Sequence, residues 1–155
     1  MPKPTYVQLN SITLAATSSL ITFSNIPQNF RDLVLIIRGS GASQYRLNPN
    51  GDTGNASLVY MDGYGTSVAS GTATQISLWY DSSTGNSLSI NHIMDYSATD
   101  KHKMVLTRGT TPGTAASAYS SRWASTAAIT SLNIVNASSG ILNIGSNLTL
   151  YGIEA

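Results

Sequence analysis

The chain has 155 residues, a length typical of one domain, and only 10% of them are charged, with a formal net charge of +1. Its basic residues are scattered, so no stripe of cations is available to neutralise the phosphates of a nucleic acid. Cysteine is absent, which excludes disulfides and thiolate ligands, and no apolar run is long enough for a signal peptide or a membrane span. We expect a single domain over residues 1–155, made in a cytoplasm, with residues 1–5 free to extend as an arm and with neither a nucleic-acid nor a membrane partner.

Alternating apolar residues predict β-strands along most of the chain. In most of these segments one face is apolar and the other is polar, as in a strand that covers a core on one side. The segment from Asp32 to Ser40 differs, because both of its alternating sets are mostly apolar, which is typical of a central strand buried on both faces. The simpler alternations are, in chain order, Ile12 with Leu14, Ile21 with Phe23, Ile76 with Leu78, Leu88 with Ile90, Leu132 with Ile134, and Leu148 with Leu150.

Short clusters of Gly, Pro, Asn and Ser separate these segments and indicate frequent turns. The single candidate for a helix is residues 112–128, where alanine favours a helix but Gly, Ser and Thr oppose it. We therefore predict an all-β fold of about nine to eleven short strands with little or no helix. The expected architecture is an antiparallel β-sandwich of jelly-roll type, with an up-and-down barrel as the alternative.

The segment from Arg46 to Ser57 is rich in Asn, Asp and Gly, a composition that suits a chain reversal. The Asn50-Gly51 pair tolerates positive φ, and the Asp52 carboxylate can accept a hydrogen bond from a backbone N–H two residues later. These properties favour turn chemistry as the role of the segment.

The same segment allows a second interpretation, a weak cation site. Asn48, Asn50 and Asp52 occupy the first, third and fifth positions of a helix-loop-helix calcium loop. However, Thr53 and Val59 stand where such a loop requires Gly and Glu, and one carboxylate is too few for a tight site. We predict no metal and no other cofactor, and keep these three residues as the weak candidate for a cation.

Four titratable residues, His92, Asp95, Asp100 and His102, lie close together in the sequence. Two histidines and two carboxylates are the components of a metal site or, with a serine, of a hydrolytic triad. Strand geometry does not force these side chains to converge, and we expect His92 to share an inward face with Leu88 and Ile90 as a structural histidine. We therefore predict no catalytic residues and no enzymatic activity.

Aromatic residues offer one further type of site. Gathered on one exposed sheet face, they would form a stacking platform for sugar rings. In a sandwich, tryptophans such as Trp79 and Trp123 more often fill the core or contact a neighbouring subunit, and we favour that interpretation. The candidate aromatics are Tyr60, Tyr64, Trp79, Tyr80, Tyr119 and Trp123.

Four blocks of the sequence together resemble a family of tailed-bacteriophage virion proteins. They contain an Ile-Pro followed by an Arg-Asp-Leu strand, the turn Asn50-Gly51-Asp52-Thr53-Gly54, and a closing Leu-Tyr-Gly-Ile strand. Leu47-Asn48-Pro49 departs from the family, whose members tend to carry a Phe before Asn-Gly-Asp. The blocks are residues 21–40, 46–57, 125–138 and 145–153.

The resemblance implies a capsid decoration, or cement, protein or the terminal domain of a tail fibre. We expect the first, because the chain begins at Met1 and reaches a strand by Tyr6 or Val7, with no preceding shaft. The family then implies a location on the outer capsid surface of the virion, a homotrimer, and the major capsid protein as partner. The alternative is a receptor-binding domain with carbohydrate as its partner.

Overall fold

The computed structural model describes residues 5–82, 87–136 and 142–154, with residues 42–43 and 79–82 described by their backbone alone. Within these ranges the chain forms twelve β-strands and no helix, so none of the described segments is a helix that could span a membrane. The predicted all-β sandwich is confirmed, with one strand more than the upper end of the expected number. The jelly-roll connectivity stays a prediction.

The larger of two sheets has eight antiparallel strands, in the order β1-β12-β3-β8-β9-β10-β5-β6. It begins and ends on edge strands that pair on one side only. Its strands are β1 (Tyr6–Thr13), β12 (Asn147–Ile153), β3 (Asp32–Gly39), β8 (Ser87–Met94), β9 (Lys103–Thr111), β10 (Ala115–Trp123), β5 (Ala56–Tyr64) and β6 (Ser67–Ala73).

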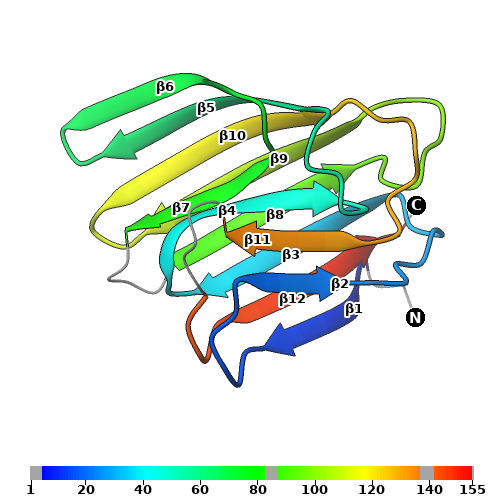
Figure 1. The fold of residues 1–155 in the computed structure, drawn as a ribbon, viewed down its shortest axis with the longest axis horizontal. Coiled ribbons are helices and arrows are strands. Elements are labelled where there is room, and N and C mark those ends of the chain that lie inside the picture. The colour runs from blue at the N-terminus through cyan, green and yellow to red at the C-terminus, as the bar shows by residue number, and fades with distance from the viewer. Residues whose placement is uncertain (1–4, 83–86, 137–141, 155) are drawn as a thin grey trace.

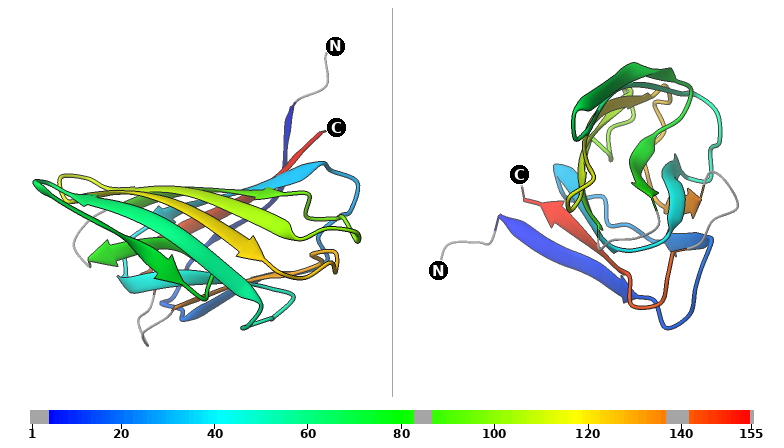
Figure 2. Two further views of the ribbon diagram at one scale, coloured as in Figure 1. Left: turned by 90° about the horizontal axis from the view of Figure 1, so that it is seen from above. Right: turned by 90° about the vertical axis from the view of Figure 1, so that its left-hand side faces the viewer.

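The smaller sheet has four antiparallel strands, in the order β2-β11-β4-β7. These are β2 (Leu20–Phe23), β11 (Leu132–Asn136), β4 (Ala42–Pro49) and β7 (Ser77–Ser82). The smaller sheet lies in front of the larger one in Figure 1, and β5 and β6 extend beyond it at the top of the view. The larger sheet twists strongly, and its β5–β6 end curves toward the side of the smaller sheet, as Figure 2 shows.

The core lies between the two sheets. Leu33 and Leu35 of β3 are fully buried against it, and Val34, on the opposite face of the same strand, is also buried, as expected for a central strand. β3 pairs with β12 on one side and with β8 on the other. The smaller sheet contributes the residues Ile21, Phe23, Tyr45, Leu47, Leu78, Leu132 and Ile134 to the same core.

Strand β8 faces the opposite way from the sequence prediction. Ser89, Asn91 and Ile93 point inward and are buried, so Leu88, Ile90 and His92 lie on the other face. The buried amides and hydroxyls are tolerated because they bond to one another: Asn91 Nδ2 donates to the Leu35 carbonyl at 3.1 Å, and Thr107 Oγ1 donates to Asn91 Oδ1 at 2.8 Å. A satisfied polar layer therefore replaces the apolar contact on which the prediction relied.

The single candidate for a helix, residues 112–128, contains the strand β10 instead, in agreement with the prediction of little or no helix. This strand pairs along its whole length with β9 and with β5. Its inward face carries Tyr119 and Trp123, both buried, while Ala116 and Ala118 lie on the other face. Pairing on both sides and burial of the two aromatic rings outweigh the helix propensity of alanine.

Candidate functional site

The chain reversal between β4 and β5 has the geometry that its sequence predicts. Asn50 and Gly51 have φ angles of 52° and 76°, and Gly54 N–H donates to Asp52 Oδ1 at 2.9 Å. Thr53 is exposed at the tip. Asn48 lies at the end of β4, opposite Asn133 of β11.

The oxygens of this turn bond to other parts of the chain. Asp52 Oδ2 accepts the indole Nε1–H of Trp123 at 2.8 Å, and Asn50 Oδ1 accepts the N–H groups of Thr130 and Ser131 at 2.9 and 3.1 Å. The bond from Trp123, with those from Gly54 and Asn55, holds the pKa of the Asp52 carboxyl below its ordinary value. The side-chain oxygens of Asn50 and Asp52, two of the three candidate cation ligands, thus act as hydrogen-bond acceptors that fix the turn to β10 and to residues 130–131.

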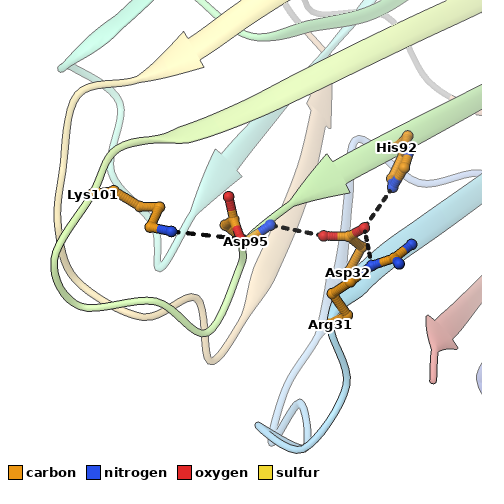
Figure 3. A network of polar contacts seen from close by, with 5 residues as sticks. All are labelled: Arg31, Asp32, His92, Asp95 and Lys101. Carbon is orange, nitrogen blue, oxygen red and sulfur yellow. Dashed lines mark hydrogen bonds and ion pairs between the residues drawn. The ribbon is translucent and has the colours of Figure 1, made fainter. Parts of the chain in front are cut away.

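His92 pairs with an acid that the sequence prediction did not include. Its Nε2 lies 3.2 Å from Asp32 Oδ2, which also accepts from Arg31 Nε at 3.0 Å, while Asp32 Oδ1 accepts the Asp95 N–H at 2.9 Å (Figure 3). Burial tends to raise the pKa of Asp32, but the bonds from Asp95, His92 and Arg31 outweigh it and hold that pKa below its ordinary value. The Asp95 carboxylate instead lies 3.9 Å from Lys101 Nζ.

The four titratable residues His92, Asp95, Asp100 and His102 do not form one site. Asp95 occupies a turn with a φ of 52°, and Asp100 and His102 are exposed in the following loop. No three His, Cys, Asp or Glu side chains come together as metal ligands anywhere in the described part of the chain. The sequence signal for Asp32 was the Arg31-Asp32 pair at the start of the buried strand β3, since a carboxylate in that position needs hydrogen-bond donors.

Lys103 is a buried cation that sequence reasoning also missed. Its ammonium lies 5.8 Å from the centre of the Trp123 ring, and burial lowers its pKa, although the charges of Asp100 and Asp95 oppose this shift. The hydrogen bonds of this ammonium hold two loops together at one end of the sandwich. Lys103 Nζ donates to the carbonyls of Ala98 at 2.6 Å, Lys101 at 3.0 Å, Thr126 at 3.0 Å and Ser125 at 3.4 Å.

Four of the candidate aromatic residues, Tyr60, Tyr64, Tyr119 and Trp123, lie on the inward face of the larger sheet. Trp123 is 2% exposed and belongs to the core, and Tyr119 is buried with its ring edge-on to Tyr60, the centroids 6.2 Å apart. Tyr64 is partly exposed at the end of β5. Trp79 and Tyr80 belong to β7, and their side chains lie outside what the structure describes. The favoured interpretation, a core position, is confirmed for Trp123.

The outer face of the larger sheet, meaning the face turned away from the smaller sheet, carries exposed apolar side chains. Cross-strand pairing places them on one side: Met61 lies opposite Ala118, which lies opposite Arg108, which lies opposite Ile90. Met61 is 64% exposed and Val68 is 88% exposed. From β8 to β6 the large apolar residues exposed on this face are Val59 and Met61 of β5, Val68 of β6, Ile90 of β8 and Met104 of β9.

The other half of the outer face carries a ladder of polar side chains beside the exposed Tyr6. On β1 and β12, Ser11 Oγ and Thr149 Oγ1 are 2.9 Å apart, and Asn147 Nδ2 donates to Thr13 Oγ1 at 2.9 Å. This ladder satisfies its own hydrogen bonds. The apolar half has no such hydrogen-bonded ladder. Covering this half with a partner surface would remove the most apolar area from water.

Three arginines lie among the apolar residues of this face. Arg108 of β9 pairs with Ile90, Arg122 of β10 with Met104, and Arg38 of β3 with Leu88. All three are exposed, and in residues 5–82, 87–136 and 142–154 no ion pair involves them. The face therefore combines exposed apolar area with uncompensated positive charge on a hydrogen-bonded sheet.

Comparison of the sequence with protein-family models, with curated proteins and with solved structures found no match. The candidate site accordingly rests on the geometry of this chain. An apolar sheet face with separated arginines suits binding to a protein surface, and the Asp32–His92 pair and the Asp52 turn serve to hold the sheet and its loops in place.

Proposed function

We propose that this protein is a non-enzymatic capsid decoration protein, which binds the outer capsid lattice, bridges major capsid subunits and stabilises the head. The observation that carries the proposal is the outer face, an exposed apolar area on a broad hydrogen-bonded sheet. The resemblance of the sequence to virion proteins supports the location and the trimeric state.

The composition supports the same role. A decoration protein is packed at high density, and a dense array of like charges would push neighbouring copies apart. With a net charge of +1 and 10% charged residues, this chain avoids that repulsion. A trimer that engages several capsid subunits needs only modest affinity at each contact, because linked contacts raise the effective concentration.

Virions that lack the protein test the proposal. We expect them to lose DNA at a lower temperature than intact virions, and to regain stability when purified protein is added back, because a ligand that binds only the assembled shell stabilises it. Equal heat resistance of the two kinds of virion, with no binding of the added protein, would remove the basis for a cement role.

One observation favours a second candidate, a receptor-binding domain for carbohydrate. Asp62 is buried on the inward face of β5, near the Tyr60–Tyr119 pair, and no hydrogen bond is made to its Oδ1 within the described residues. A carboxylate oxygen beside tyrosines is a suitable acceptor for sugar hydroxyls. A glycan array distinguishes the candidates: hits that disappear in Asp62→Asn support the receptor role, and an array without hits removes it.

A further inference from the structure

The three arginines of the outer face indicate the chemistry of the surface that it binds. This step rests on the proposed function and concerns the same face. Arg38, Arg108 and Arg122 point away from the core on three different strands, and each has an apolar neighbour directly across the sheet. A guanidinium in this setting becomes costly to bury unless the partner supplies an acceptor for it.

The chain itself supplies no such acceptor in the described ranges. The acid of the outer face, Asp32, already accepts hydrogen bonds from His92 and Arg31 at one end of β3. Asp62 is on the inward face of β5, and Asp95 and Asp100 lie in the loop after β8. The apolar half of the outer face is therefore cationic, although the whole chain is close to neutral.

The spacing of the arginines excludes a single small anion. Arg108 pairs with Ala118, four residues before Arg122, so with ~3.4 Å per residue and ~4.8 Å between strands their Cα atoms are about 14 Å apart. The same geometry places Arg38 about 12 Å from Arg108, across β8. The three groups form a diagonal, and each must meet its own acceptor.

We propose that the outer face of the eight-stranded sheet binds a protein surface that presents separate carboxylates to Arg38, Arg108 and Arg122, with apolar side chains between them. Arg-carboxylate pairs are bidentate and directional, so the diagonal fixes the orientation of the bound protein. Ile90 and Met104 lie among the arginines, Met61 flanks them on β5, and the three supply the dry contact area. In the proposed function the partner surface belongs to the major capsid protein.

A nucleic acid is a poorer occupant of this face. Its phosphates would leave the methionines and Ile90 facing a charged backbone, and three widely separated cations release few counterions. An anionic membrane is also a poorer occupant, because the apolar side chains of a sheet face reach only a short way into a bilayer. Preferential binding to either one would overturn the proposal.

The experiment measures binding of the purified protein to capsids from virions that lack it, by co-sedimentation over a range of salt concentrations. Arg108→Gln and Arg122→Gln should each weaken binding about tenfold and flatten its salt dependence, and the triple variant with Arg38→Gln should abolish it. Lys101→Gln, which removes one exposed positive charge outside the outer face, is the matched control and should bind within about twofold of the unchanged protein. Arg108→Lys should recover part of the affinity, because it keeps the charge and loses the bidentate fork.

Apolar substitutions provide an independent test on the same capsids. Ile90→Thr should weaken binding, whereas Ile144→Thr, an exposed isoleucine in the turn before β12, should not. All variants alter exposed side chains, so their thermal unfolding should match that of the unchanged protein, and this is measured alongside.

The outcomes separate the two proposals. If the unchanged protein does not bind capsids, both the proposed function and this inference fail. If it binds but the arginine variants bind equally well, the decoration role stands and the inference is wrong. Arginine-dependent binding to duplex DNA, or to vesicles of 30% phosphatidylglycerol, that exceeds binding to capsids would also overturn it.

Discussion

The indole Nε1–H of Trp123 donates a 2.8 Å hydrogen bond to Oδ2 of Asp52, a residue 71 positions earlier in the chain. The ring is buried in the core, whereas the carboxylate lies in the turn between β4 and β5. This bond joins the end of the larger sheet to the smaller one, and its acceptor is the acid that the sequence marked as a candidate cation ligand.

Replacing Asp52 should destabilise the fold, because the hydrogen bond from Trp123 is lost and not because a metal ion is lost. Asp52→Ala leaves the buried Trp123 N–H without an acceptor, and we expect a loss of about 1–3 kcal/mol in the free energy of unfolding. Thr53→Ala, on the exposed tip of the same turn, should change it by less than about 0.5 kcal/mol. Urea denaturation measures both, and equal stability of the two variants would show that the bond to Trp123 contributes nothing.

Asp32 should make the stability depend on pH in the acid range. Because its pKa is lower in the folded protein than in the unfolded chain, its contribution is complete above the ordinary pKa near 3.8 and is lost as the pH falls through the folded value. Asp32→Asn should therefore cost about 1–3 kcal/mol at pH 7, and the difference from the unchanged protein should shrink below pH 4.

Denaturation at pH 7 and at pH 3 checks the prediction for Asp32. The control is Asp100→Asn, which alters an exposed carboxylate and should have little effect at either pH. A cost for Asp32→Asn that stays constant between the two pH values would contradict the assignment of Asp32 as an ionised acceptor.

Tyr119 should make the free energy of unfolding fall as the pH rises into the alkaline range, which is the opposite of the pH dependence expected for Asp32. Burial, together with the nearby Asp62 charge, raises the pKa of Tyr119 far above its ordinary value of 10.0, despite a hydrogen bond with Ser117 that opposes the shift. Its contribution to stability is complete below the unfolded pKa and is lost as the pH rises above it, because only the unfolded chain releases the proton.

The Tyr119→Phe variant isolates this effect. Between pH 10 and pH 12 its free energy of unfolding should fall less steeply than that of the unchanged protein, by about 1.4 kcal/mol per pH unit, which corresponds to one proton. Parallel stability curves in that range would mean that Tyr119 ionises in the folded protein.

Lys103→Met should be strongly destabilising, although Lys103 makes no ion pair among the side chains that the structure describes. The ammonium is fully buried and donates to the carbonyls of Ala98, Lys101, Ser125 and Thr126, so methionine leaves these acceptors without their donor. We expect a loss of about 2 kcal/mol or more. Lys101→Met, an exposed position nearby, serves as the control in thermal unfolding, and an equal effect there would refute a specific role for the buried ammonium.

Sequence periodicity predicted the strands well but not always the face that each strand buries. For β3 both faces are apolar, and the central position followed directly. In β8 the buried face carries Ser89 and Asn91, so the alternation pointed to the wrong side. Asn91 bonds to β3 and β9, and Ser89 Oγ accepts from Asn91 Nδ2 at 3.0 Å. When buried polar side chains find their hydrogen-bond partners on other strands, the sequence of their own strand does not show that they are buried.

The candidate binding face was hidden for a similar reason. In β5 apolar residues stand on both faces, with Leu58 buried and Val59 and Met61 exposed, so the pattern alone did not separate core from surface. The arginines of the face lie on β3, β9 and β10, and only the pairing of these strands brings them onto one surface. Lys103 and Asp32 were missed because their partners are backbone groups and residues distant in sequence.

Electron cryo-microscopy of intact virions tests the central claim most directly, because it gives both the location of the protein and the face that it uses. We predict many copies on the outer capsid lattice, with the outer face of the eight-stranded sheet, including Arg108 and Met61, against the major capsid protein. Density for the protein at the distal end of the tail, or on the capsid with that face turned to solvent, would contradict this assignment.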